Sequence, residues 1–506
     1  MTEPAPRPPR PPLSLLVFVV GAAALGIEIA AVRLLAPYFG ASEVVWANTI
    51  GVVLVALSVG YWLGGRIGDR RPHMADLCAA VMIGAALTAA LPFVARPLLD
   101  VGVEALDSVS AGAFVGSLLA TLLLLAVPVL VLGTVAPWAL RIGIEQVDKL
   151  DAGKLAGRLY ALGTAGSLVG TLLCALVLVP GIGTRRTFLL FALTLALVGL
   201  IGVARRPRWA VLPVVIAVLF VIPQSAIKPS STAGKVIFED ESASQYLRVI
   251  EGASGSRTLE LNEGQSRHSF YQPTTVLTND YWDAALVLPL ATTAKPPARV
   301  AILGNAAGTT ARAFAEFFPE TQVDGVDIDG ELAGVGRSYF GLKDKNFTAH
   351  TADARPYLRA TDKRYDALIL DAYRQPYIPF YLTTREFFAL ARDRLRHNGT
   401  VVVNVGHPVG SEVLERVLAA TMAEEFQHVW IDHTRPTNSM LVASDSPVQP
   451  ALVVRGTAGI PELAPTGRRE ASRLMMAPTD GDVYIDDRAP VEWLIDRSIV
   501  QYAAGE

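Results

Sequence analysis

The chain divides into two parts that suit different solvents. Residues 1–224 carry only 16 Lys and Arg and 11 Asp and Glu, whereas residues 225–506 carry the remaining 28 and 36. A stretch of this length with so few charges is too apolar to fold in water. The second half has the composition and the length of a globular domain that buries a full core. The sequence therefore predicts an α-helical membrane bundle followed by a soluble domain.

Seven apolar runs lie in the first half after a Pro-rich tail at 1–12, and each is long enough for the roughly 20 residues that cross a bilayer as a helix. We expect them at about 13–35, 44–65, 75–95, 112–138, 156–179, 186–204 and 209–225. Lys and Arg gather in the tail and in alternate loops, so the positive-inside rule places the N-terminus in the cytoplasm. Seven spans would then put the soluble domain on the outer face of the cell membrane.

Two charged features interrupt the apolar half. Glu28 and Arg33 lie inside the first predicted span. Three interpretations are open: a binding or transport site, a structural ion pair, or an Arg33 side chain that extends to the membrane interface. The glycine-rich and arginine-rich segment 64–71, between the second and third spans, resembles the loop motif of major facilitator transporters.

Composition also restricts the cofactors and partners. The two cysteines, Cys78 and Cys174, lie in apolar runs, so the sequence implies neither a disulfide framework nor a cysteine metal site. The scattered histidines lack the spacing of metal ligands. The second half has 28 basic and 36 acidic side chains, a net charge of −8, which argues against nucleic acid as a partner.

The soluble half has an orderly pattern of its own. A linker at 226–235 leads to short β-like runs at 245–250 and 257–261, which predict a small antiparallel subdomain over 236–290. From 291 to 506, strands alternate with helices, which predicts a mostly parallel, doubly wound sheet of the Rossmann-like type. The predicted strands are 299–303, 322–327, 365–371, 399–405 and 439–443.

A set of small and acidic residues marks the carboxyl ends of these strands, where open α/β sheets bind ligands. The set is the small-residue turn from Gly304 to Gly308, then Asp327, Asp353 and Asp371. Small residues let the backbone approach a nucleotide, and an acid after the second strand suits ribose hydroxyls. Taken alone, each of these acids could simply cap a helix. We interpret Asp329, which is not part of the set, as such a cap. The ordered set predicts a nucleoside-binding crevice.

With these motifs the chain resembles the spermidine synthase family, the polyamine aminopropyltransferases. It is most similar to the bacterial group in which that domain, here about 236–500, is fused to a membrane bundle. The resemblance implies a sheet of the class I methyltransferase type. It also implies transfer of an aminopropyl group from decarboxylated S-adenosylmethionine to an amine such as putrescine, with methylthioadenosine as the product. The nucleoside would be a co-substrate and not a tightly bound cofactor.

The resemblance assigns roles to individual residues. Asp371 would accept the proton in catalysis. The nucleoside would contact Gln245, Gly304, Gly308, Asp327, Asp353 and Ala354. The substrate site would include Tyr281, Trp282, Tyr373 and Arg374.

The sequence departs from the family at three charged or polar positions. Ala307 stands where the family has an acid in the turn, Trp282 replaces a His or Gln, and Arg374 replaces the second acid of an Asp-x-x-Asp motif. If Arg374 points into the pocket, the acceptor should carry a carboxylate or phosphate, or be a monoamine. Otherwise Arg374 turns outward and pairs with an acid such as Glu386.

Nearby aromatic residues allow two interpretations, either a cage for a cation or a packed lid over the crevice. They are Trp282, Tyr373, Tyr377, Phe380 and Tyr381.

Two other functions remain open from the sequence. One is a transporter or sensor whose soluble domain only binds a nucleoside or polyamine. The other is a related transferase with a different acceptor. Assembly into a homo-oligomer is also left open.

Overall fold

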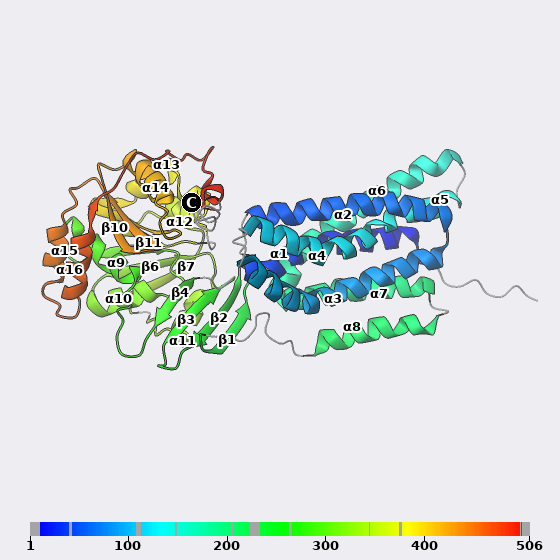
Figure 1. Cartoon of the computed structure of the whole chain (residues 1–506), viewed down its shortest axis with the longest axis horizontal. Helices are drawn as coiled ribbons and strands as arrows, with labels where there is room; N and C mark the ends of the chain where they lie inside the picture. The colour runs from blue at the N-terminus through cyan, green and yellow to red at the C-terminus, as the bar shows by residue number, and fades with distance from the viewer. Residues whose placement is uncertain are drawn as a thin grey trace, which may run out of the picture. The chain divides into compact units, whose positions relative to one another are not determined.

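The computed structural model describes residues 11–39, 43–107, 113–146, 149–203, 206–222, 233–262, 266–343, 345–373, 377–495 and 497. The chain forms two compact units, residues 1–229 and 230–506 (Figure 1). Each unit is described by itself below.

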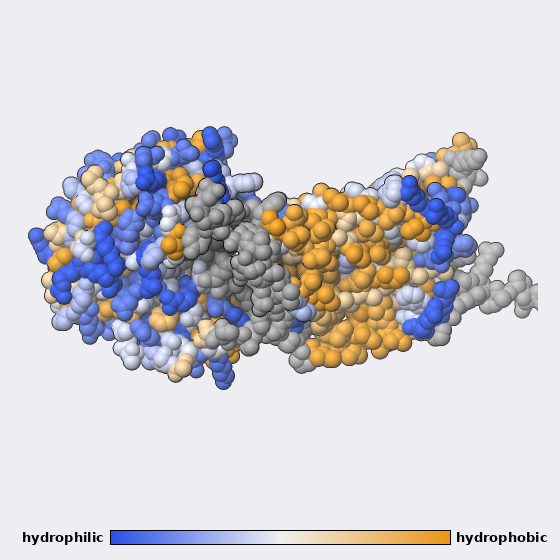
Figure 2. All heavy atoms as spheres, viewed as in Figure 1, coloured by the Kyte–Doolittle hydropathy of each residue, from blue (hydrophilic) through white to orange (hydrophobic). Residues whose placement is uncertain are grey.

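The first unit is helical. Its α-helices are α1 (Leu13–Phe39), α2 (Glu43–Arg70), α3 (Met74–Asp107), α4 (Ala113–Gly133), α5 (Val135–Ile144), α6 (Ala152–Leu173), α7 (Val179–Val203) and α8 (Val211–Val221). Within the described ranges, five helical stretches are long and apolar enough to cross a membrane: Leu13–Phe39, Val45–Arg70, Met74–Ala95, Val115–Ile144 and Ala152–Val203. Figure 2 shows apolar side chains over much of the visible surface of these helices.

The seven predicted spans correspond to these five stretches and α8. Ala152–Val203 takes up two predicted spans, because the helix continues on both sides of a break at Gly183, whose φ of 78° and ψ of 166° suit only glycine. The seventh predicted span is a helix, Arg208–Val221, that is shorter than the roughly 20 residues of a full span. The predicted membrane bundle is therefore confirmed, with a span count of about seven that remains approximate.

The predicted loop at 64–71 is another difference. Helix α2 continues to Arg70, so the glycines of this segment lie on a helix. A Cβ on Gly64 would come within 2.3 Å of the Thr134 carbonyl oxygen, so the glycine allows two backbones to touch. Asp69 then pairs with Arg141 of α5 at 2.9 Å.

Small residues also join α1 to α6. A Cβ on Gly166 would lie 2.1 Å from the Phe18 carbonyl oxygen, and one on Gly170 would lie 2.0 Å from the Ala22 carbonyl oxygen. Such close backbone contact is typical of helices that associate in lipid. Glu28 lies in this bundle with 7% of its surface exposed, so it faces the protein interior.

The second unit begins with a four-stranded antiparallel sheet, as predicted. Its strands follow one another in chain order: β1 (Lys235–Glu241), β2 (Tyr246–Glu251), β3 (Arg257–Leu261) and β4 (Arg267–Tyr271). Leu247, Val249 and Leu259 are fully buried and pack with Leu332 and Val335 of helix α11 (Leu332–Tyr339). This contact fixes the small sheet against the larger part of the same unit.

The larger part is an eight-stranded sheet with helices around it. Its strands are β5 (Arg299–Leu303), β6 (Gln322–Asp327), β7 (Phe347–Thr351), β8 (Tyr365–Leu370), β9 (Leu395–Gly406), β10 (His428–Arg435), β11 (Asn438–Ser444) and β12 (Met475–Met476). The other helices are α9 (Tyr281–Val287), α10 (Thr309–Phe317), α12 (Ala354–Ala360), α13 (Arg385–Asp393), α14 (Val413–Ala423), α15 (Pro450–Thr457) and α16 (Ala464–Arg473). The strand order is β12-β10-β11-β9-β8-β5-β6-β7.

The pairing confirms a mostly parallel sheet with an antiparallel edge. Strands β7, β6, β5, β8 and β9 are parallel, whereas β11, β10 and β12 are antiparallel to their neighbours. The chain winds from β5 through β6 to β7, then returns to the other side of β5 with β8. This reversal puts the switch point of the strand order at the carboxyl ends of β5 and β8, the place where doubly wound sheets bind their ligands.

Candidate active site

The turn after β5 needs glycine at its first position. Gly304 has a φ of 90°, in the left-handed region that favours glycine. A Cβ here would lie 2.3 Å from the Asp371 carbonyl oxygen, so any side chain would collide with the segment that follows β8. The Gly304 and Asn305 N–H groups donate to the Val326 carbonyl at 2.9 and 3.2 Å. The predicted turn therefore packs directly against the strand ends on both sides of β5.

Asp327, the last residue of β6, holds the turn by its side chain. Its Oδ2 accepts the Ala306 N–H at 2.9 Å, and its Oδ1 accepts the Asp329 N–H at 3.1 Å. Burial raises the pKa of this carboxyl to about 6, although both backbone donors oppose that rise. The structure thus brings Asp327 and the glycine turn together, as the sequence predicted.

Gln245 lies between β1 and β2 and reaches the same edge of the large sheet. Its Nε2 donates to Asp329 Oδ2 at 3.1 Å, and the Ser242 hydroxyl donates to the same oxygen at 2.7 Å. The other oxygen of Asp329 accepts the Glu331 N–H at 3.1 Å, just before α11. Asp329 therefore holds the turn before α11, whose N-cap is Glu331 and not Asp329 as predicted, and it also binds Gln245.

Asp353 precedes α12 and caps it. Its Oδ1 accepts the Arg355 N–H at 3.1 Å, and its Oδ2 accepts the Tyr381 hydroxyl at 2.6 Å. Ala354, the first residue of the helix, is buried. The Arg355 guanidinium forms a two-point ion pair with Asp486 at 2.6 and 2.7 Å, which fixes the C-terminal segment beside this cap.

Asp371 directly follows β8, which lies on the other side of β5 and its Gly304 turn from β6 and Asp327. Its Oδ1 accepts the Asn404 amide at 2.8 Å, and its side chain also accepts a hydrogen bond from Tyr281. Burial raises the pKa of Asp371 to about 7, and the hydrogen bonds from Asn404 and Tyr281 oppose that rise. The Asn438 amide in turn donates to Asn404 Oδ1 at 3.0 Å. Asp371 is thus a half-buried acid with a pKa near neutrality and a side chain oriented by Asn404 and Tyr281.

Tyr373 stabilises the next strand instead of pointing freely into the crevice. Its hydroxyl donates to the Asn404 carbonyl at 2.8 Å and accepts the Gly406 N–H at 2.6 Å. Burial raises the pKa of this phenol, so it remains protonated. Tyr373 therefore secures the end of β9, from which Asn404 reaches Asp371.

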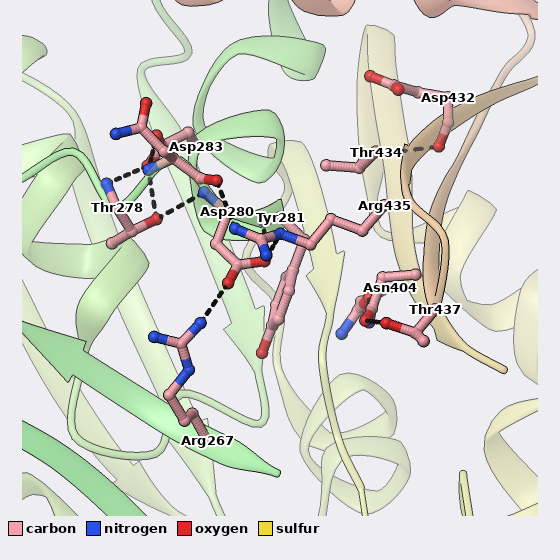
Figure 3. Close-up of polar contacts among 12 residues, drawn as sticks. Arg267, Thr278, Asp280, Tyr281, Asp283, Asn404, Asp432, Thr434, Arg435 and Thr437 are labelled. Carbon is pink, nitrogen blue, oxygen red and sulfur yellow. Dashed lines mark hydrogen bonds and ion pairs between the residues drawn. The ribbon is translucent and has the colours of Figure 1, made fainter. Parts of the chain in front are cut away.

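Tyr281 begins α9, and the residue before it caps that helix. Asp280 Oδ1 accepts the Tyr281 N–H at 2.9 Å. Arg267 of β4 donates to Asp280 Oδ2 at 2.8 Å, and Arg435 of β10 approaches Oδ1 at 2.7 Å. Figure 3 shows the Asp280 carboxylate between these two guanidinium groups, with the Tyr281 ring beside them. Three distant segments therefore meet at the residue that positions Tyr281.

The preceding loop is also fixed. Asp283 accepts the Thr278 N–H and hydroxyl, each at 2.9 Å, and the Asn279 N–H at 2.7 Å. Trp282 has 3% of its surface exposed, and its ring centre lies 4.4 Å from that of Tyr281. Trp282 therefore packs behind Tyr281, away from solvent.

Comparison with known proteins identifies the family. A family model described as "Spermine/spermidine synthase domain" matches residues 285–437. A curated relative, "Probable polyamine aminopropyl transferase" of Bifidobacterium longum, is 30% identical over 319 residues, which cover 58% of this chain and 70% of the relative.

This chain belongs to the polyamine aminopropyltransferase family.

A second relative, "Polyamine aminopropyltransferase" of Vibrio vulnificus, is 36% identical over 112 residues, covering 21% of this chain and 38% of the relative. Among solved structures, a probable spermidine synthase from Corynebacterium glutamicum matches with 17% identity and a TM-score of 0.40. That match covers 52% of this chain and 99% of the other.

The other aromatic residues considered for a cage or lid occupy different surroundings. Tyr377 has 1% of its surface exposed and packs in the core beside the sheet, whereas Phe380 is 39% exposed. Tyr381 lies edge-on to Phe380, with ring centres 5.5 Å apart, and bonds to Asp353. Tyr377 and Phe380 therefore differ sharply in their access to a ligand.

Two further departures from the family are Ala307 and Arg374. Ala307 is fully buried, and its N–H donates to the Ser269 hydroxyl at 3.0 Å, so the small sheet reaches the place where the family has an acid. Arg374, for which we predicted a role toward the acceptor, lies outside the described residues. Among the residues that are described, no cluster of three or more His, Cys, Asp or Glu has the geometry to hold a metal ion.

Sequence reasoning missed several polar residues of this aminopropyltransferase site. Asn404 had a usable signal, because it is a polar residue near the carboxyl end of a predicted apolar strand. Asp280 had a weaker signal as a residue that precedes a helix. Arg267 and Arg435 had none, since only the fold brings them to Asp280.

Proposed function

We propose that the protein transfers the aminopropyl group of decarboxylated S-adenosylmethionine to an amine. The single observation that carries this proposal is the state of Asp371, a half-buried acid with a pKa of about 7 that Asn404 and Tyr281 orient at the carboxyl edge of the sheet. Membership of the polyamine aminopropyltransferase family supports the same reaction.

The nucleoside occupies the side of the crevice nearest β6 and α12. Asp327 accepts the ribose hydroxyls, while Gln245 and the glycine turn approach the same part of the ligand. Asp353 and Ala354 lie along the adenine. This arrangement exposes the carbon next to the sulfonium toward Asp371 and Tyr281.

The chemistry requires an unprotonated amine. An aliphatic amine with a pKa of roughly 10.4 is protonated at neutral pH, so a proton must leave before or during attack. Asp371 takes that proton, and the nitrogen forms a bond to the aminopropyl carbon. The carbon–sulfur bond breaks, its electron pair remains on sulfur, and neutral methylthioadenosine leaves. A base with a pKa near the working pH suits this task.

The helical unit embeds the enzyme in a membrane. Five long apolar stretches among the described residues support this placement, and the loop charges favour a cytoplasmic N-terminus. Ala152–Val203 takes up two predicted spans, so the five stretches give six crossings. A crossing by α8 would make seven and place the soluble unit on the side opposite the N-terminus.

The test uses the full-length protein in detergent or lipid nanodiscs. With decarboxylated S-adenosylmethionine and an amine, we expect equal amounts of methylthioadenosine and of aminopropylated amine, measured by mass spectrometry. The control replaces the co-substrate with S-adenosylmethionine, whose carboxylate distinguishes the two nucleosides. Binding of methylthioadenosine without any turnover would support the transporter or sensor alternative and contradict the proposed reaction.

A further inference from the structure

The polar cluster beside Tyr281 has more positive than negative charge. Arg267 and Arg435 both pair with Asp280, at 2.8 and 2.7 Å. The Asp280 side chain is 7% exposed, whereas the two arginine side chains are 46% and 40% exposed. Two guanidinium groups on one carboxylate leave one positive charge uncompensated. The two guanidinium groups are the more exposed part of the cluster.

This cluster lies next to the proposed reaction centre. Asp280 and Tyr281 are adjacent in the chain, and the Tyr281 hydroxyl bonds to Asp371. The Tyr281 side chain therefore links the positive cluster to the acid that takes the proton. An amine whose nitrogen faces Asp371 would place its far end toward Arg267 and Arg435.

The acids near this cluster already accept hydrogen bonds and ion pairs from other groups of the protein. Asp280 accepts the Tyr281 N–H and both arginines, and Asp283 accepts donors from Thr278 and Asn279. A second ammonium group could reach Asp280 only by displacing a guanidinium. Like charges that approach a partly desolvated guanidinium are repelled, so this end disfavours a diamine.

The arginines retain donors for an anion. Within the described part of the chain, Arg267 uses its Nη2 toward Asp280, and Arg435 uses Nε toward Asp280 and Nη2 toward the Asn279 carbonyl. Nε and Nη1 of Arg267 and Nη1 of Arg435 therefore remain available. Guanidinium donors in a fixed plane suit the two oxygens of a carboxylate.

We infer that the natural acceptor is an amine that also carries a carboxylate, with Arg267 and Arg435 as the residues that determine this specificity. The inference rests on the proposed function, because it concerns the second substrate of that reaction. It assigns the nitrogen of the acceptor to Asp371 and its carboxylate to the two arginines.

Three amines with the same four-carbon chain test this inference. γ-Aminobutyrate carries a distal carboxylate, butylamine carries a methyl group, and putrescine carries a second ammonium. With the full-length protein and decarboxylated S-adenosylmethionine, we expect kcat/KM to fall in that order, with γ-aminobutyrate about 10-fold or more above putrescine. Raising the salt concentration should narrow the difference, since the arginines are partly exposed.

Variants then test the two residues. Replacing both arginines (Arg267→Gln with Arg435→Gln) should lower the preference for γ-aminobutyrate over putrescine by about 10- to 100-fold. Arg392→Gln is the matched control, because Arg392 of α13 is also 46% exposed and pairs with an acid, Asp445. It should keep the wild-type preference. Methylthioadenosine binding reports whether each variant is folded.

The possible results separate the two claims. Preference of the wild type for putrescine would overturn the inference and leave aminopropyl transfer intact, as would an unchanged preference in a folded double variant. If none of the three amines gives methylthioadenosine although the nucleoside binds, the proposed function fails, and the inference fails with it.

Discussion

The proposed nucleoside side and the proposed acceptor side of the site are held by contacts of different range. Asp327 and Asp353 each accept a backbone N–H two residues further along the chain, from Asp329 and Arg355, and each also accepts one hydrogen bond from a more distant segment. Asp371 instead depends on the side chain of Asn404, 33 residues away, and on Tyr281. Each of the first two acids therefore has a local contact in its own turn, whereas the contacts that hold Asp371 come from distant segments. The two sides should therefore respond differently to substitution.

The largest expected effect is on the acceptor side. Asp371→Asn keeps the size of the side chain but cannot accept a proton at neutral pH. We expect turnover to fall by roughly 10²-fold or more, while methylthioadenosine binding remains close to that of the wild type. Single-turnover release of methylthioadenosine and calorimetry of its binding measure the two effects. An Asn variant with full turnover would remove Asp371 from the role of base.

The nucleoside side should show the reverse pattern. Asp327→Ala removes the hydrogen bonds of a charged carboxylate to the ribose, so we expect methylthioadenosine binding to weaken by about 1.5–3 kcal/mol. The measurement is calorimetry of methylthioadenosine binding.

Asp366→Ala is the matched control for that prediction. Asp366 is an acid of the same sheet, near the amino end of β8, where it accepts the Arg299 N–H at 2.8 Å. Its removal should not change nucleoside affinity, because it lies at the opposite end of the strand from the crevice. Equal affinity in Asp327→Ala and the wild type would contradict the assignment of Asp327.

The same difference in range explains what the sequence predicted. Strands β5 and β6 were predicted with their observed bounds, because each is an apolar run that ends at a turn or an acid. Strand β7 was missed because its sequence, Phe-Thr-Ala-His-Thr, has no apolar run and forms an edge of the sheet. Strand β10 was missed because His, Asp and Arg interrupt its apolar residues.

The site residues follow the same division. Gly304, Asp327, Asp353 and Asp371 were found because each stands beside its own strand, and the structure places them at one edge of the sheet. Arg435 was not found, since its contact with the Asn279 carbonyl spans 156 residues. No local pattern encodes such a pair.

The smallest expected effect concerns the pH dependence of the acceptor side. Asp371 must be ionised to act as a base, so kcat/KM for the amine should rise with pH around the pKa of about 7. The ionisation of the amine, at roughly 10.4, lies well above this range. A pH profile of kcat/KM between these limits therefore isolates Asp371.

Tyr281→Phe sharpens this test, because it removes a hydrogen bond to the charged form of Asp371 while leaving the ring in place. That hydrogen bond lowers the pKa of Asp371, so its loss should raise the pKa, and the midpoint of the profile should move to higher pH. We expect a shift below about one pH unit, the size that corresponds to roughly 1.4 kcal/mol. Butylamine as the acceptor avoids any effect of a distal charge. If the midpoint stays in place or moves to lower pH, Tyr281 does not act on catalysis through the ionisation of Asp371. The hydrogen bond from Tyr281 would then not be one of the long-range contacts that set the acceptor side apart.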